Sequence, residues 1–169
     1  AAKIADGVNI LSVNLNAARK RLHAMSWVEN AEIRREFPDT FIIRIREHSP
    51  VAVIEMGGLF LINTSGEIFT ETGDDEFEDL PVITGIKYTT WKTESRGGKP
   101  VAGSVIKVIE LARKEGCVLP FESIKKISVD KDLGLTVTTG EFPAEKIHLG
   151  FGGYEDKYRR LSEIFSYLK

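Results

Sequence analysis

The first regular pattern of hydrophobic and polar positions predicts a helix from about Asn14 to Met25. Leu15, Ala18, Leu22 and Met25 recur at spacings of three and four residues, which places them on one face of a helix. Asn14 can accept hydrogen bonds from the free backbone amides of the first turn, so it is the predicted N-cap. The segment is therefore an amphipathic helix whose apolar face needs a partner.

After this helix the period changes to two, which predicts a β-hairpin. Apolar residues alternate with polar ones on both sides of a turn at Pro38-Asp39. Pro50 ends the unit because proline donates no hydrogen bond to a strand ladder. We expect one small core containing Leu15, Leu22, Trp27, Ile33, Phe41 and Ile43.

Beyond Pro50 the pattern predicts a larger antiparallel sheet with two helices. Gly57-Gly58 and Ser65-Gly66 have the composition of hairpin turns. The predicted strands cover residues 51–55, 59–63, 67–70, 81–84, 124–129, 133–139 and 146–151. One helix is predicted over about 101–115, and a last helix carries an apolar stripe of Tyr154, Tyr158, Leu161, Phe165 and Leu168. We expect a second core containing Val105, Ile109, Leu161 and Phe165.

These elements predict an α+β fold in two domains. Residues 1–49 form a helix plus a β-hairpin. Residues 50–169 form a larger antiparallel β domain with flanking helices. The chain opens at Ala1 within a predicted element, so we expect it to be a piece of a longer protein.

Composition removes several functional classes. Hydrophobic residues make up 42% of the chain and charged residues 28%, as in ordinary folded domains. The 23 basic and 25 acidic residues are interspersed, so the sequence lacks the basic stripe of a nucleic-acid-binding protein. No apolar run reaches the length of a membrane-spanning helix. The single cysteine, Cys117, excludes an internal disulfide, and its apolar neighbours predict a buried small side chain.

The sequence contains only weak candidates for metal-binding, phosphate-binding, nucleotide-binding or catalytic motifs. His23, His48 and His148 lack the spacing of a zinc site. The acidic loop at 71–79 lacks the register of a calcium loop, so we expect it to be solvated. The glycine-rich segments at 97–100 and 150–153 depart from the phosphate-loop and dinucleotide motifs. We therefore predict no catalytic residue, no cofactor and no metal.

The segment Trp27–Ala52, WVENAEIRREFPDTFIIRIREHSPVA, resembles the signature of the POTRA module in the FtsQ/DivIB cell-division family. A tryptophan-valine pair precedes a charged strand, and an arginine pair leads to a proline turn, an apolar strand, a glutamate and Pro-Val-Ala. The matching residues are Trp27, Val28, Arg34, Arg35, Pro38, Glu47, Pro50, Val51 and Ala52.

Weaker similarities follow in the family's order, so the resemblance covers most of the chain. GVNILSVNLNAARKRL is similar to the entry into the second POTRA helix. LFLINTSGEIF and LPVITG are similar to early parts of the family's β domain. KIHLGFGGYEDKYRRLSEIF is similar to the strand, glycine turn and helix that come late in it.

The resemblance implies a POTRA-like domain over 1–49 that lacks its first strand, and an FtsQ-type β domain over 50–169 that lacks its terminal strand. It implies a single-pass inner-membrane protein with this part in the periplasm, and a membrane helix outside this chain. Its partners would be FtsB- and FtsL-type division proteins, and possibly an FtsK-type protein. The implied role is a non-enzymatic scaffold at the septum.

The resemblance also places the FtsB-type partner near the last helix and the terminal strand after it. The aromatic residues near that position are Phe151, Tyr154 and Tyr158, which are our candidate partner-binding residues. Tyr154 and Tyr158 lie on the apolar stripe, so burial in the core is the alternative for both.

Two other functions stay open at this point. POTRA units also occur in outer-membrane assembly and secretion proteins, where they chaperone unfolded strands, but those proteins string several units together. A hydrolase acting on cell-wall material would need paired carboxylates facing a cleft.

Overall fold

The computed structural model describes residues 10–73, 76–91, 100–140 and 144–167. The chain divides into two compact units, residues 1–49 and residues 50–169. Each unit has a hydrophobic cluster of its own. The fold is α+β, with a helix and a hairpin in the first unit and a larger, mostly antiparallel sheet with helices in the second.

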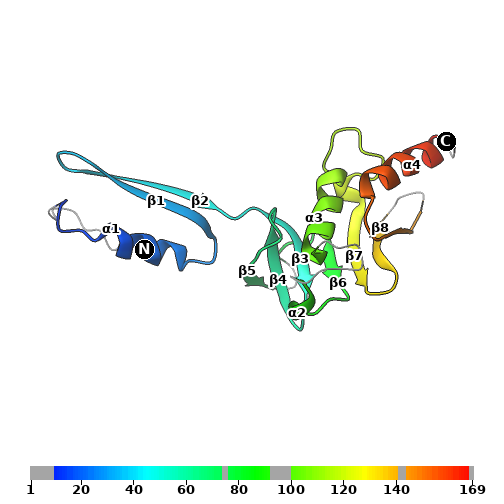
Figure 1. Ribbon diagram of the computed structural model, residues 1–169, viewed down its shortest axis with the longest axis horizontal. Coiled ribbons are helices and arrows are strands. Elements are labelled where there is room, and N and C mark those ends of the chain that lie inside the picture. The colour runs from blue at the N-terminus through cyan, green and yellow to red at the C-terminus, as the bar shows by residue number, and fades with distance from the viewer. Residues whose placement is uncertain (1–9, 74–75, 92–99, 141–143, 168–169) are drawn as a thin grey trace. The chain divides into compact units, whose positions relative to one another are not determined.

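The smaller unit consists of helix α1 (Leu15–His23) and the antiparallel hairpin of β1 (Val28–Glu36) and β2 (Thr40–Glu47). Figure 1 shows α1 lying alongside the hairpin. The predicted N-cap is confirmed, because the backbone amide of Ala17 donates to Asn14 Oδ1 at 3.0 Å. The apolar face of α1 packs against β1 in a core of Ala18, Leu22, Val28, Ala31 and Ile33, with Leu15 at its margin.

The predicted core of this unit was wrong in part. The hairpin register pairs Ile33 with Ile43, so the two side chains share a face of the hairpin. Ile33 is 3% exposed, whereas Ile43 is 41% exposed and Trp27 is 38% exposed. The reason is that α1 packs against β1, and the β2 half of the face receives less cover. Phe41 is only half-buried for the same reason.

The described residues of the larger unit form a seven-stranded sheet in the order β5-β4-β3-β6-β7-β8-β9. Its strands are β3 (Pro50–Glu55), β4 (Leu59–Asn63), β5 (Ile68–Thr72), β6 (Val82–Thr84), β7 (Ile124–Asp130), β8 (Gly134–Thr139) and β9 (Lys146–Gly150). The predicted hairpin of β3 and β4 and the predicted meander of β7, β8 and β9 are confirmed as antiparallel pairs.

The predicted all-antiparallel pairing is wrong at the short strand β6. It pairs in parallel with β3 on one side and with β7 on the other. A parallel neighbour requires a long crossover, and here the chain between β6 and β7 supplies one through two helices. These helices are α2 (Tyr88–Trp91) and α3 (Val101–Ala112), and a short 3-10 turn, η1 (Phe121–Ser123), precedes β7.

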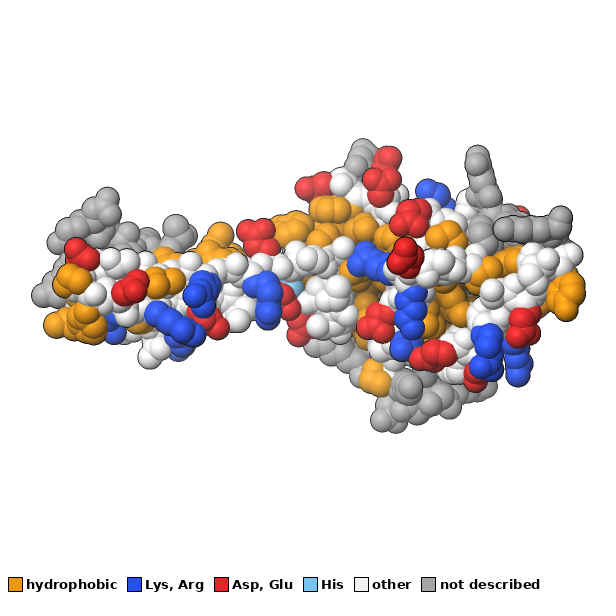
Figure 2. Space-filling model, turned by 90° about the horizontal axis from the view of Figure 1, so that it is seen from above, with side chains coloured by type: hydrophobic (Ala, Val, Ile, Leu, Met, Phe, Trp, Pro, Cys, Tyr) orange, Lys and Arg blue, Asp and Glu red, His pale blue; other side chains and the backbone are white. Residues whose placement is uncertain are grey.

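The main core lies between the sheet and the helices α3 and α4 (Tyr154–Tyr167) (Figure 1). Val105 and Ile109 of α3 are buried there, as predicted, while Leu161 of α4 is partly buried against the same cluster. Phe165 is half-buried and is not a member of that cluster. Figure 2 shows basic and acidic side chains interspersed over the face in view, which fits the mixed charge pattern of the sequence.

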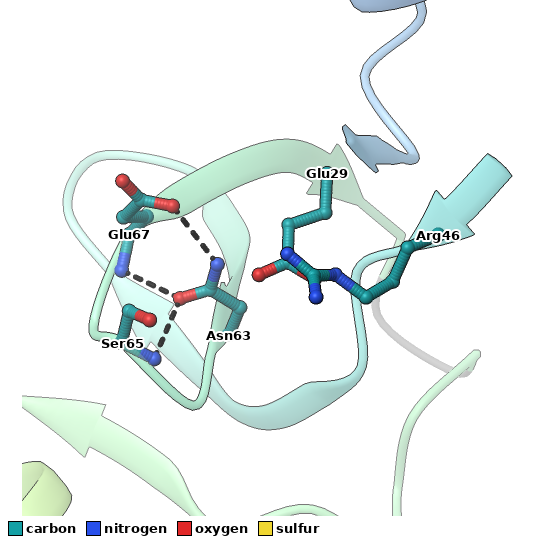
Figure 3. Close-up of polar contacts among 5 residues, drawn as sticks. All are labelled: Glu29, Arg46, Asn63, Ser65 and Glu67. Carbon is teal, nitrogen blue, oxygen red and sulfur yellow. Dashed lines mark hydrogen bonds and ion pairs between the residues drawn. The ribbon is translucent and has the colours of Figure 1, made fainter. Parts of the chain in front are cut away.

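The turn between β4 and β5 is organised by one buried amide (Figure 3). Asn63 is 2% exposed, and its Oδ1 accepts hydrogen bonds at 2.9 Å from the backbone amides of Ser65 and Glu67. Its Nδ2 donates to Glu67 Oε2 at 3.0 Å. The backbone carbonyl of Gly66, which lies between Ser65 and Glu67 in this turn, accepts a hydrogen bond at 2.8 Å from the indole of Trp91. The Trp91 side chain is fully buried. These contacts tie the turn to α2.

An ion pair links the two strands of the smaller unit near their open end. Arg46 Nε of β2 lies 2.9 Å from Glu29 Oε2 of β1, and both side chains are drawn in Figure 3. The arginine side chain is 69% exposed, so the pair contributes little to stability.

Candidate partner-binding surface

Strand β9 is the last strand of the described sheet and pairs only with β8 there. A terminal strand presents one row of backbone amide and carbonyl groups away from its neighbour. Such an edge can accept a strand from another chain, with the backbone supplying affinity and side-chain pockets supplying specificity. The end of the sheet at β9 is therefore the candidate partner-binding surface.

The side chains of β9 alternate between core and solvent. Ile147 and Leu149 are buried, whereas Lys146 and His148 are exposed. His148 Nδ1 lies 3.0 Å from Thr136 Oγ1 of β8, a cross-strand hydrogen bond on the exposed face. This histidine therefore lies on the solvent-facing side of the sheet, bonded to a neighbouring strand.

Lys157 of α4 binds backbone carbonyl groups at the end of β9. The β8–β9 register pairs Thr136 with His148 and Leu135 with Gly150, so Leu149 is left without a partner as a bulge. The ammonium of Lys157 donates to the carbonyl of Leu149, and to that of Phe151 at 3.1 Å. This contact fixes the first turns of α4 against the end of the strand.

The segment between β9 and α4 turns sharply through three glycines. Gly150, Gly152 and Gly153 have φ values of 61°, 56° and 60°, in the left-handed region that favours glycine. The helix can therefore begin immediately at Tyr154. The glycine-rich sequence serves this turn, as predicted, and no nucleotide motif is needed to explain it.

Two of the three candidate aromatic residues lie in the core. Tyr154 is 4% exposed and Tyr158 is 7% exposed. The hydroxyl of Tyr158 donates to the carbonyl of Val108 in α3 at 3.2 Å, and the hydroxyl of Tyr154 donates to that of Gly150 at 3.4 Å. These rings hold α4 against α3 and the end of β9, and they are not available to a partner. Phe151 is half-buried and stays a candidate.

Burial also sets the acidity of Tyr158. Removal from water disfavours the phenolate, and the nearby Cys117 thiol adds a smaller effect in the same direction. The pKa of Tyr158 is therefore held well above its ordinary value of 10.0. Cys117 itself is half-buried, its thiol donates to the carbonyl of Leu119 at 3.3 Å, and burial raises its pKa.

The second half of α4 exposes apolar side chains that do not belong to the predicted apolar stripe of this helix. Ile164 is 54% exposed and Tyr167 is 89% exposed. Neither residue belongs to the stripe of Tyr154, Tyr158 and Leu161, so helical spacing alone gave no reason to single them out. They extend the candidate surface along the helix away from β9.

Other sites considered in the sequence gain no support from the described residues. Across residues 10–73, 76–91, 100–140 and 144–167, no three histidine, cysteine, aspartate or glutamate side chains are grouped to hold a metal. Part of the acidic loop, at 74–75, and part of the glycine segment, at 97–99, lie outside the described residues. No helix within the described part of the chain has the length and hydropathy to cross a membrane.

Comparison with protein-family models assigns both units. A family described as "POTRA domain, FtsQ-type" matches residues 1–48. A second, described as "Cell division protein FtsQ/DivIB, C-terminal", matches residues 52–169.

Curated relatives agree with the family matches along nearly the whole chain. The chain is 32% identical over 163 residues to "Cell division protein FtsQ" of Anaeromyxobacter sp. (strain K), covering 96% of this chain and 54% of the relative. It is 30% identical over 170 residues to the proteins of the same name from Geotalea daltonii and Geobacter sp. (strain M21), covering 60% and 61% of those relatives. The chain thus spans somewhat more than half the length of these relatives.

Proposed function

Because the chain belongs to the FtsQ/DivIB family of cell division proteins, we propose that it is the partner-binding part of a non-enzymatic scaffold at the division septum. The scaffold recruits and links FtsB- and FtsL-type division proteins. An FtsK-type protein is a further candidate partner. The single observation that carries the proposal is the consecutive match of a POTRA unit and an FtsQ/DivIB C-terminal unit on one chain.

In the proposed setting, residues 1–169 lie on the periplasmic side of the inner membrane. A transmembrane helix elsewhere in the protein anchors them there. The relatives are longer than this chain, which leaves room for such a segment. This position would bring β9 and α4 to the compartment in which septal wall synthesis takes place.

The end of the sheet supports a binding role on physical grounds. The outer edge of β9 can add a strand, Phe151 directly follows that strand, and Ile164 and Tyr167 place exposed apolar surface on the second half of α4. Aromatic side chains at interfaces combine a large apolar area with few rotatable bonds. We propose that a division protein binds across the β9 edge and the exposed side of α4.

Co-purification from dividing cells tests this proposal. The full-length protein carrying an affinity tag is isolated after brief cross-linking, alongside an equally tagged, unrelated inner-membrane protein. We expect FtsB- and FtsL-type proteins to be enriched with the full-length protein over the control. Equal recovery of these proteins with both baits would contradict the proposal.

A further inference from the structure

The parallel strands β3 and β6 lie at a reversal in the chain topology. Val53 pairs with Val82 and Ile54 with Ile83, so the carboxyl ends of both strands lie at the same edge of the sheet. From β3 the chain turns to β4 on one side, whereas from β6 it continues through α2 and α3 to β7 on the other side (Figure 1). Adjacent parallel strands whose connections leave in opposite directions create a crevice beyond their carboxyl ends.

A cleft occupies this position. It has a volume of about 550 Å³ and is lined by residues 55–57, at the carboxyl end of β3, and residues 85–88, which follow β6. The strand topology and the cleft are separate observations that agree on the same place. Every lining residue belongs to the larger unit and to the described part of the chain.

The cleft has an apolar floor and an aromatic wall. Ile86 is 8% exposed and belongs to the main core, and Met56 packs against the same core while remaining half-exposed. Tyr88 is 61% exposed beside them. Gly57, with φ of 83°, has no atom within 4 Å of the place where a Cβ would stand, so the cleft stays open on that side. Methionine and tyrosine are among the residues enriched in protein interfaces.

The rim of the cleft carries one charge of each sign. Glu55 is the last residue of β3, Lys87 lies in the segment after β6, and both side chains are exposed. Neither takes part in the salt bridges found among the described residues. A complementary occupant therefore presents an apolar side chain to the floor, a basic group to Glu55 and an acidic group to Lys87.

The exposure of Tyr88, Glu55 and Lys87 shows that the cleft is open to solvent. Sites for small molecules bury most of the ligand surface, which an open cleft of this kind does not do. A polypeptide can cover such a cleft and insert a single side chain. The occupant that fits is an extended segment of a protein.

We propose that this cleft is a second docking site, which receives an aliphatic or aromatic side chain from an extended segment of a partner protein, flanked by one basic and one acidic residue. The assignment of that partner to the division proteins rests on the proposed function. The site itself rests on the topology, the cleft and its lining.

Peptide titration followed by NMR tests the site directly. The probes are blocked heptapeptides with a central leucine, with arginine and aspartate on its two sides in either order. The control peptide has serine in place of leucine. We expect saturable shifts of the Met56 and Ile86 methyl groups and of the amides of residues 55–57 and 85–88 with one leucine peptide. We expect at least fivefold weaker binding of the serine peptide.

Variants of the purified chain distinguish binding at this cleft from nonspecific binding. Tyr88→Ala should lower the affinity for the leucine peptide at least fivefold, because the exposed ring forms one wall of the cleft. Glu55→Lys should lower the affinity for the same peptide, because it removes the contact to the peptide's arginine. Leu133→Ala removes a similarly exposed apolar side chain between β7 and β8, outside the cleft, and should leave the affinity for the leucine peptide unchanged. The proposal is overturned by an absence of saturable shifts, by shifts spread over the surface, or by equal binding to the wild type and Tyr88→Ala.

The two proposals fail independently. If peptides bind as expected but FtsB- and FtsL-type proteins do not co-purify, the cleft is supported as a docking site, and the assignment of its partner to the division proteins is contradicted. If those proteins co-purify and no peptide binds, the scaffold function stands and the cleft is not a docking site.

Discussion

Gly134, the first residue of β8, lies directly against the backbone of Gly150, the last residue of β9. A Cβ placed on Gly134 would stand 2.3 Å from the carbonyl carbon of Gly150 and 2.4 Å from its oxygen. Gly134 also has φ of 77°. The close approach allows β9 to finish beside β8 and the chain to turn into α4, so this glycine pair shapes the candidate surface.

Gly134→Ala should destabilise the larger unit by about 2 kcal/mol or more, because backbone strain and a backbone clash act together. Gly152→Ala is the matched control. Gly152 has φ of 56° but no atom within 4 Å of its missing Cβ, so only the conformational cost of ~1 kcal/mol applies. Urea unfolding of the three proteins measures the difference. Equal losses in both variants would show that the predicted clash is relieved by a backbone shift.

Asn63→Ala should destabilise the β4–β5 turn, because it removes the buried side-chain acceptor of the backbone amides of Ser65 and Glu67. A loss of ~1–3 kcal/mol is expected for such groups. Ser65→Ala is the control, since Ser65 contributes its backbone amide and its side chain is exposed. The free energy of unfolding should be nearly unchanged in the control. A neutral Asn63→Ala would mean that water replaces the amide.

The raised pKa of Tyr158 predicts a loss of stability in alkali. The folded pKa lies above the unfolded value of roughly 10, so the contribution is fully present below that pH and is lost as the pH rises through the folded pKa. Unfolding between about pH 8 and about pH 11.5 should therefore show a steeper decline in the wild type than in Tyr158→Phe. Parallel declines would show that the phenol ionises as readily in the folded chain as in the unfolded one.

Phe151→Ala should weaken the binding of an FtsB-type extracytoplasmic domain, by ~2 kcal/mol if the ring lies at the centre of the interface. Phe69→Ala is the matched control, because Phe69 is also half-buried but lies on β5 at the opposite end of the sheet. Calorimetric titration compares the two variants with the wild type. A similar effect of both substitutions would remove Phe151 from the interface.

The sequence predicted local structure well where the hydrophobic period is strong. The Asn14 cap, the β1–β2 hairpin and the β7–β9 meander all depend on short-range spacing and turn chemistry. The four-residue helix α2 was missed because its sequence, Tyr-Thr-Thr-Trp, is too short to show a helical period. The parallel pairing of β6 was missed because strand order depends on the crossover and not on the strand itself.

Burial was the least predictable feature of the candidate site. Tyr154 and Tyr158 were placed correctly on one face of a helix, but helical spacing does not tell whether that face meets the core or a partner. Ile43 shows the opposite case, since strand alternation placed it on the core face and α1 packs against the neighbouring strand. Both outcomes depend on tertiary contacts that a local pattern does not contain.

Depletion of the full-length protein tests whether it recruits division partners to the septum, as we propose. The measurement is the position of a fluorescent FtsB-type protein in cells from which the full-length protein is removed and then restored. We predict that depletion disperses the fluorescent protein while the cells grow into filaments, and that restoration returns it to the septum. An FtsB-type protein that stays at the division site throughout depletion would contradict the account.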